Sequence, residues 1–290
     1  MQSWTERLKG NGLELAVHRF ADGSVEPSGT TVLLLHGFMD SGCTWDLLAA
    51  GLAPCGHALY APDFRGFGGS DRVSGGGYYH FPDYVADIAA LVEQIPSDEL
   101  VVVGHSMGGT VATLYAGARP ERVAKLVLME GTGPPDMGSK VAVIRMRRWL
   151  TDVLKTRSPQ PLGSLDDALT RLALFHPRID EAILTTRARL LSRTESDGAL
   201  AWTFDPLHRS TSPSAFKAAE LNAFLAEISC PVLFIGGGPT GWHPPDEQNR
   251  LDALHAPAQR VELNEAGHMM HWTEPLACAR AIADFIDQPG

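Results

Sequence analysis

The chain has 290 residues, of which 44% are apolar and 20% are charged, with a formal net charge of −10. This composition is typical of a globular protein that buries a sizeable core, and not of a disordered chain. The acidic balance argues against nucleic-acid binding, because phosphate contacts need clustered Lys and Arg. No apolar run approaches the roughly 20 residues of a membrane span, and the first residues lack the apolar segment of a signal peptide. We therefore expect a cytoplasmic protein without a membrane span.

Short apolar runs alternate with helical patterns along most of the chain. In chain order, this alternation predicts strands at 13–20, 31–35, 58–61, 100–103, 123–129, 231–235 and 260–263, and helices at 81–94, 107–118 and 273–287. The run at 31–35 is almost entirely β-branched or leucine, as in a strand buried on both faces. Such alternation indicates an α/β fold built on a parallel sheet.

The middle of the chain differs from the rest. Between 136 and 213 helical patterns dominate, and no run resembles a buried strand. Twelve of the 24 Lys and Arg residues lie between Asp136 and Ser212, but only nine of the 34 Asp and Glu residues. We interpret 136–213 as a helical cap inserted between two parts of a core, 1–135 and 214–290. The basic residues either solvate exposed helices or attract anionic substrates to the entrance.

A five-residue motif carries the strongest chemical signal. Gly104-His105-Ser106-Met107-Gly108 has the form G-x-S-x-G, and it follows a predicted buried strand and opens a helix rich in small residues. A serine on such a turn sits in a strained backbone conformation with its hydroxyl outside the sheet. The flanking glycines leave room for the turn. The motif predicts that Ser106 is a nucleophile.

Three further motifs extend this pattern and occur in a consistent order. They are His36-Gly37-Phe38-Met39 after the first buried strand, Asp63-Phe64-Arg65-Gly66-Phe67-Gly68-Gly69-Ser70, and Ala266-Gly267-His268 after a late strand. With Ser106, they resemble the α/β-hydrolase superfamily, in its branch of small capped serine hydrolases. The resemblance implies a mostly parallel eight-stranded sheet with helices on both faces. It also implies esterase-like or lipase-like chemistry with no metal and no organic cofactor.

The remaining catalytic roles follow from this resemblance and from general chemistry. Serine is a poor nucleophile without a base, and His268 is the predicted base because histidine can take and return a proton near neutral pH. The backbone N–H groups of Phe38 and Met107 are the predicted oxyanion hole, where each donor contributes about 3 kcal/mol to the transition state. Asp63 and Arg65 are interpreted as residues that tie loops together.

The third triad member departs from the family pattern. Most relatives place an Asp in the loop after the strand that matches 231–235, but residues 236–245 contain no acid, and Thr240 stands at the expected position. Two other residues are candidates for the triad acid. Glu130 ends the predicted strand 123–129, where some α/β-hydrolases place their acid, and a carboxylate there is costly without a partner. Asp246 is the alternative acid, although it is also expected to cap a helix.

These residues predict hydrolysis of a small carboxylic ester through an acyl-enzyme. The alternatives are cleavage of another acyl bond (lactone, thioester, amide or C–C) or a ligand-binding homologue that has lost turnover. Haloalkane dehalogenase and epoxide hydrolase chemistry is disfavoured because those enzymes use an Asp where this chain has Ser106. The cap is expected to form an apolar pocket, and no pattern specifies an oligomeric state. The aromatic residues that could line this cap pocket are Trp149, Phe175, Trp202 and Phe204.

Overall fold

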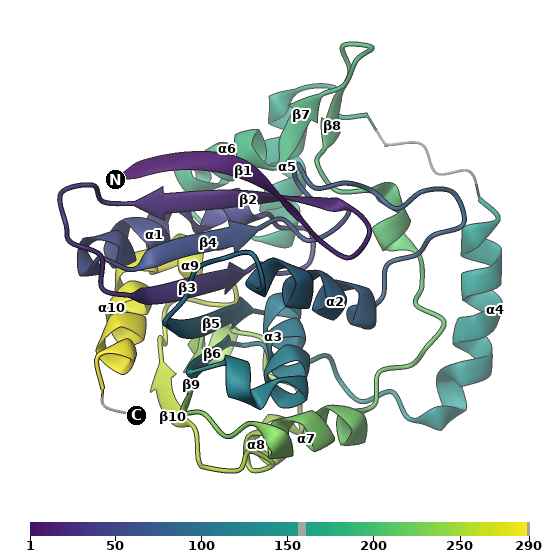
Figure 1. The fold of residues 1–290 in the computed structure, drawn as a ribbon. Helices are drawn as coiled ribbons and strands as arrows, with labels where there is room; N and C mark the ends of the chain where they lie inside the picture. Colours follow the sequence, from purple (N-terminus) through teal and green to yellow (C-terminus); the bar gives the residue numbers. More distant parts are fainter. Residues whose placement is uncertain (156–160, 289–290) are drawn as a thin grey trace.

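The computed structural model describes residues 1–155 and 161–288, and an eight-stranded sheet forms its centre (Figure 1). The strand order is β1-β2-β4-β3-β5-β6-β9-β10; β1–β2 and β2–β4 are antiparallel, and every other neighbouring pair is parallel. The predicted fold class is therefore confirmed. The strands are β1 (Gln2–Lys9), β2 (Glu14–Ala21), β3 (Thr30–Leu35), β4 (Ala58–Pro62), β5 (Glu99–His105), β6 (Lys125–Met129), β9 (Val232–Gly236) and β10 (Gln259–Glu262).

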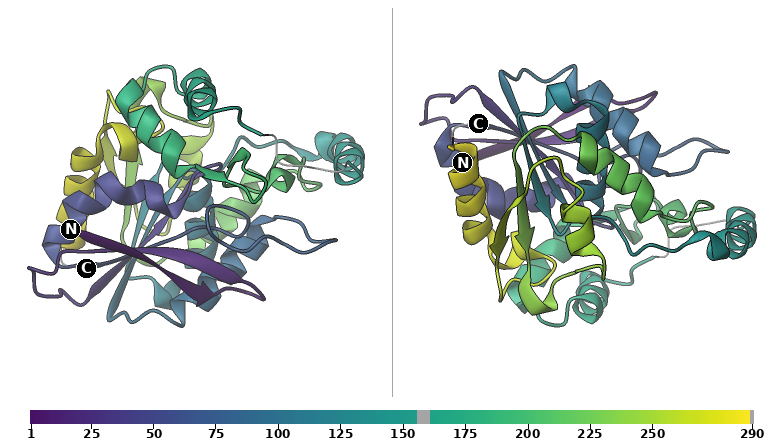
Figure 2. Two further views of the ribbon diagram at one scale, coloured as in Figure 1. Left: turned by 90° about the horizontal axis from the view of Figure 1, so that it is seen from above. Right: turned by 90° about the horizontal axis from the view of Figure 1, so that it is seen from below.

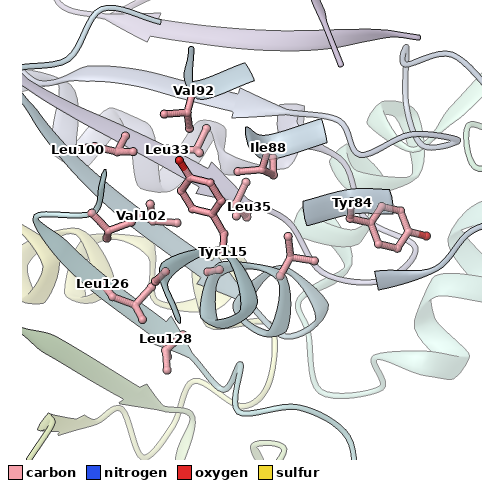
Figure 3. Packing of buried hydrophobic residues seen from close by; sticks show 14 of the residues in the cluster. Leu33, Leu35, Tyr84, Ile88, Val92, Leu100, Val102, Tyr115, Leu126 and Leu128 are labelled. Atoms are coloured by element: carbon pink, nitrogen blue, oxygen red, sulfur yellow. The ribbon is translucent and has the colours of Figure 1, made fainter. Parts of the chain in front are cut away.

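Alternating side chains on the central strands divide the core into two layers. Leu33 and Leu35 point to one face and Val32 and Leu34 to the other, and all four are fully buried. The first face is covered by α2 (Phe81–Val92), α3 (Met107–Ala118) and α7 (Ala218–Glu227), part of which appears in Figure 3. The second is covered by α1 (Asp46–Leu52) and α10 (Pro275–Ile286). Burial on both faces explains why these strands are mostly apolar on both sides.

Two differences from the sequence prediction have simple physical causes. Strand β1 was not predicted, because it is an edge strand with a largely polar, exposed sequence and therefore lacks an apolar run. The predicted helix 273–287 is interrupted, and α9 (Met270–Thr273) precedes α10. The break falls at Glu274, whose backbone leaves the helical region because the residue before a proline disfavours it.

The segment 136–213 is helical as predicted, with one addition. It contains α4 (Ala142–Val153), α5 (Leu165–Phe175) and α6 (Glu181–Leu190), and also an antiparallel hairpin of β7 (Ser192–Thr194) and β8 (Leu200–Trp202). The hairpin strands have three residues each and are mostly only part-buried, so they carry no recognisable apolar alternation. Helix α4 lies to one side of the sheet and its covering helices (Figures 1 and 2). Within 1–155 and 161–288, no helix has the length and apolar character to cross a membrane.

One buried lysine ties the strand that precedes Glu130 to the last helix. Lys125 opens β6, and its Nζ donates to the carbonyl oxygens of Phe285 (3.2 Å), Ile286 (2.5 Å) and Gln288 (2.5 Å). The last carbonyls of a helix have no partner within the helix. A cation at this end also interacts favourably with the helix dipole.

We expect Lys125→Met to lower the free energy of unfolding by about 1–3 kcal/mol, because it leaves carbonyl groups without their charged donor. Urea denaturation followed by circular dichroism measures this change. Lys9→Met is the matched control, since Lys9 is exposed and surface substitutions usually change stability by less than about 0.5 kcal/mol. Equal stabilities of the two variants would show that the Lys125 contacts contribute nothing.

Candidate active site

Ser106 lies on a sharp turn between β5 and α3. Its backbone has φ 53° and ψ −117°, and its N–H donates to the carbonyl oxygen of Met129 on β6 at 3.0 Å. Such a conformation is strained for a residue with a side chain and persists only where the surroundings enforce it. Strand β5 is central, between β3 and β6, and this position fixes the turn.

The glycines of the motif permit close backbone contacts. A methyl group at Gly104 would lie 2.5 Å from Gly109 Cα, and one at Gly108 would overlap the Leu35 carbonyl. Both positions therefore require glycine on steric grounds. This is the role that the sequence analysis gave them.

The structure brings Ser106, His268 and Glu130 together. Ser106 Oγ lies 3.1 Å from His268 Nε2, and His268 Nδ1 lies 2.7 Å from Glu130 Oε2. A carboxylate only accepts hydrogen bonds, so Nδ1 carries the proton and Nε2 is free to accept from the serine hydroxyl. The three side chains thus form one hydrogen-bonded chain, with the serine at one end and a buried carboxylate at the other.

Glu130 is buried and receives three hydrogen bonds. Besides His268, the backbone N–H groups of Gly237 and Trp242 each donate to it at 2.6 Å. Its side chain is fully buried, and its backbone has φ 48°, in the left-handed region. A buried carboxylate is tolerated only when it is paired and hydrogen-bonded. The loop that lacks an acid therefore supplies the donors for an acid on the neighbouring strand.

His243 is a further partner of this carboxylate. Its Nε2 lies 3.4 Å from Glu130 Oε1, and its Nδ1 donates to Glu247 Oε2 at 2.9 Å. Burial lowers the pKa of His243, but the hydrogen bond and charge of Glu247, together with the charge of Glu130, outweigh it and raise the pKa. The sequence did not predict the contacts of Gly237, Trp242 and His243 with Glu130. The one available signal for them was the glycine-rich loop 236–241 after a buried strand.

Neither of the other two positions considered for the acid supplies a carboxylate to His268. Thr240 is exposed. Asp246 occupies the N-cap position of α8 (Glu247–Leu251) but makes no capping hydrogen bond there. Its carboxylate instead pairs with Arg250 at 2.8 and 3.0 Å. The cap expected at Asp246 is therefore absent, because a fully buried guanidinium is the stronger partner.

The loop after β3 passes close to the serine. A methyl group at Gly37 would lie 3.3 Å from Ser106 Cβ, so the following Phe38 starts beside the nucleophile. In the described part of the chain, the backbone N–H groups of Phe38 and Met107 have no hydrogen-bond partner. His36 fixes the loop: its Nδ1 donates to the Gly37 carbonyl at 2.7 Å, and Phe64 N–H donates to its Nε2 at 3.0 Å.

A cavity of about 460 Å³ opens above Ser106 and is lined by aromatic side chains that include Phe38 and Trp149. Residues 207, 208 and 210–213 form part of its wall. The other aromatic residues named above lie elsewhere: Phe175 is 77% exposed, and Trp202 stacks on the buried Phe204 with ring centroids 6.3 Å apart. Of the four, Trp149 alone lines this cavity.

In the described ranges, one group of three buried residues has ligand atoms close enough together to hold a metal ion. The group consists of Asp40, His105 and His271. Each of the two histidines makes one side-chain hydrogen bond. His271 Nε2 donates to Asp40 Oδ2 at 3.1 Å, and His105 Nε2 donates to the His268 carbonyl at 2.8 Å. Burial lowers the pKa of both histidines well below its usual value. We interpret the group as packing that positions the His268 backbone.

Asp63 and Arg65 tie loops together, as expected. Asp63 accepts from Ser41 Oγ (2.5 Å), Gly42 N–H (2.7 Å) and Gly69 N–H (2.8 Å). Arg65 makes a bidentate contact with the buried carboxylate of Asp87, with both distances 2.6 Å. The first set connects the loops after β3 and β4, and the second anchors the loop after β4 to helix α2.

Comparison with known proteins agrees with this geometry. Residues 30–275 match the family model described as alpha/beta hydrolase fold. The chain therefore belongs to the α/β-hydrolase family.

Among curated proteins, a serine hydrolase-like protein of Dictyostelium discoideum is 27% identical over 236 residues, which cover 79% of this chain and 64% of that protein. The chain thus spans less than two thirds of that relative. A 2-hydroxy-6-oxononadienedioate/2-hydroxy-6-oxononatrienedioate hydrolase of Cupriavidus pinatubonensis is 25% identical over 96% of this chain and 93% of its own length. The crystal structure of a hypothetical protein from Pseudomonas aeruginosa superposes with a TM-score of 0.85 at 27% identity, over 98% of this chain and 99% of that one.

A side chain at Gly241 is expected to disturb the Glu130 site. A methyl group there would overlap Glu130 Oε1, and overpacking a tight site typically costs about 1–3 kcal/mol. We expect Gly241→Ala to lower the free energy of unfolding by this amount in urea denaturation. Gly75→Ala is the control, because nothing lies within 4 Å of a methyl group at Gly75. A Gly241→Ala variant as stable as this control would contradict the packing described here.

The His243 contacts predict a pH-dependent contribution to stability. Because its folded pKa is raised, the stabilisation is complete below the unfolded pKa and is lost as pH rises through the folded pKa. His243→Gln should therefore lower Tm at about pH 5 and leave it nearly unchanged at about pH 9. The exposed His255 provides the control His255→Gln. An effect of His243→Gln that is equal at both pH values would exclude this ion pair as the cause.

Proposed function

We propose that the protein is a serine hydrolase that cleaves a carboxylic ester through an acyl-enzyme, with Ser106, His268 and Glu130 as its triad. The hydrogen-bonded chain from Ser106 Oγ through His268 to the buried Glu130 is the observation that carries this proposal. Membership of the α/β-hydrolase family supports hydrolysis as the reaction class.

In the proposed first step, Ser106 Oγ attacks the ester carbonyl while His268 Nε2 takes the hydroxyl proton. The negative charge that develops on the carbonyl oxygen would be stabilised by the N–H groups of Phe38 and Met107, which have no partner within the described chain. His268 then returns the proton to the departing alcohol, and the acyl group remains on Ser106.

In the second step, water attacks the acyl-enzyme with His268 again as general base, and the acid product leaves. Glu130 would hold the Nδ1–H tautomer throughout and stabilise the imidazolium that forms twice in the cycle. Its donors at Gly237 and Trp242 keep the carboxylate oriented toward His268.

The pocket supports a small apolar substrate. A volume of about 460 Å³ and a lining that includes several aromatic side chains are typical of small-molecule sites. We propose that segment 136–213 acts as the cap, since Trp149 and residues 207–213 contribute to the wall. Hydrolysis of a C–C bond is the second candidate, because the Cupriavidus pinatubonensis relative carries the name of a hydrolase of 2-hydroxy-6-oxo dienedioates.

The first test is p-nitrophenyl ester hydrolysis, from acetate to a long acyl chain, by the wild type and by Ser106→Ala. We expect Glu130→Gln to lower kcat by about 10⁴-fold, because the neutral amide no longer holds the correct tautomer of His268. Asp246→Asn tests the alternative acid and is expected to leave kcat close to the wild-type value. The chain-length profile then reports the size of the pocket.

Glu265→Gln is the matched control, since Glu265 is exposed near His268 in the sequence. Circular dichroism establishes that each variant is folded. If Asp246→Asn collapses the rate and Glu130→Gln does not, Asp246 is the acid. If the wild type turns over no ester above the Ser106→Ala background, the ester proposal is wrong. Lactones, thioesters, amides and 2-hydroxy-6-oxo dienoates are then the substrates to test.

A further inference from the structure

Helix α4 (Ala142–Val153) is amphipathic, yet its apolar side faces solvent. Val143, Met146, Leu150 and Leu154 recur at helical spacing and are 60%, 44%, 49% and 85% exposed. We call these four residues the α4 stripe. An amphipathic helix of a globular protein normally buries this side against the core, and a run of large exposed apolar residues marks an interaction surface.

The other side of α4 is fastened to the protein. Arg145 Nε donates to the Ser212 carbonyl at 3.1 Å, and the N–H of Thr211 donates to the Asp152 carboxylate at 3.1 Å. Trp149, between them on the same side, lines the cavity above Ser106. These contacts fix the orientation of the helix, so the exposure of the α4 stripe is a consequence of how α4 is attached. Figure 2 shows α4 projecting beyond the remaining helices in two views.

The charge around the stripe is strongly basic. Between residues 139 and 155 there are five basic side chains and one acidic one, a net charge of +4. Four of the five basic side chains are exposed, namely Lys140, Arg147, Arg148 and Lys155. Because the whole chain carries −10, the remaining residues carry −14. The α4 region is therefore a basic, apolar projection from an acidic protein.

We propose that α4 docks the protein on an anionic lipid surface. A helix with an apolar stripe flanked by Lys and Arg lies in the plane of a membrane interface, with the stripe among the acyl chains and the cations at the headgroups. The long basic side chains can reach the phosphates while their stems stay in apolar surroundings. The helix is about 18 Å long, and Trp149 on its inner side would place the cavity mouth near the lipid.

A second copy fits the stripe less well. A symmetric dimer through α4 would bring the basic side chains of both helices together, and like charges repel. Four partly exposed side chains also offer far less than the about 800 Å² per partner that a stable interface buries. Docking on lipid needs no complementary groove, and the proposal does not depend on the proposed esterase activity.

Sedimentation with vesicles tests the proposal. The full chain is mixed with vesicles of phosphatidylcholine alone or of equal parts phosphatidylcholine and phosphatidylserine. We expect binding to the anionic vesicles that weakens as salt is raised. Arg147→Gln/Arg148→Gln should reduce the partition coefficient about fivefold for each arginine removed. Val143→Asn/Leu150→Asn should reduce binding further, since the apolar insertion is lost.

Matched controls change the same residue types on other exposed surfaces. Arg189→Gln/Arg280→Gln removes two exposed arginines, and Leu174→Asn removes a leucine that is 77% exposed on α5; both should bind like the wild type. The proposal is overturned if anionic vesicles bind no better than neutral ones, or if these controls lose as much binding as the α4 variants. A wild-type dimer in analytical ultracentrifugation that Val143→Asn/Leu150→Asn dissociates, without vesicle binding, would assign the stripe to a second copy. A monomer that binds no vesicle would equally refute lipid docking and leave an acidic protein as the partner to seek.

Discussion

The arrangement of this site depends on one buried carboxylate. Glu130 directly follows β6, accepts a hydrogen bond from His268 Nδ1, and also accepts hydrogen bonds from the backbone N–H groups of Gly237 and Trp242. These donors come from two parts of the chain: the loop between β9 and α8 supplies both N–H groups, and the loop after β10 carries His268. Without Glu130, two buried N–H groups and an imidazole would lose their acceptor, at a cost of about 1–3 kcal/mol for each unsatisfied group. The carboxylate thus organises the edge of the sheet as well as the proposed base.

Backbone strain is concentrated at the same edge. In the described ranges, the non-glycine residues with positive φ are Met39, Ser106 and Glu130. They follow β3, β5 and β6, three neighbouring parallel strands. Each such residue costs about 1–3 kcal/mol and persists only where its surroundings over-determine it. Around Ser106 the packing is close, because a methyl group at Gly37, Gly104 or Gly108 would lie 2.9 Å or less from neighbouring atoms.

The sequence predicts the central sheet well because its strands are buried on both faces and therefore form mostly apolar runs. Edge strand β1 and the short hairpin β7–β8 carry no such pattern, since partial exposure leaves their composition free. Family membership followed from motifs whose spacing is sterically constrained. Ser106 and His268 lie in such motifs, whereas Glu130 had to be inferred from the absence of an acid in 236–245. The donors around Glu130 were beyond prediction, because backbone N–H groups leave no trace in residue type.

Glu130 and Ser106 directly follow adjacent strands, and this has a mechanical consequence. His105 pairs with Met129 in the β5–β6 ladder, and the next residues along are Ser106 and Glu130. The separation of these two residues is therefore set by the paired backbone of the central strands β5 and β6, whereas His268 comes from the loop after β10. Thermal fluctuation in the proposed triad should be concentrated in the imidazole, because the backbone of the two flanking residues is held by the sheet. In relatives whose triad acid lies in the loop after β9, two of the three triad residues would instead lie in loops.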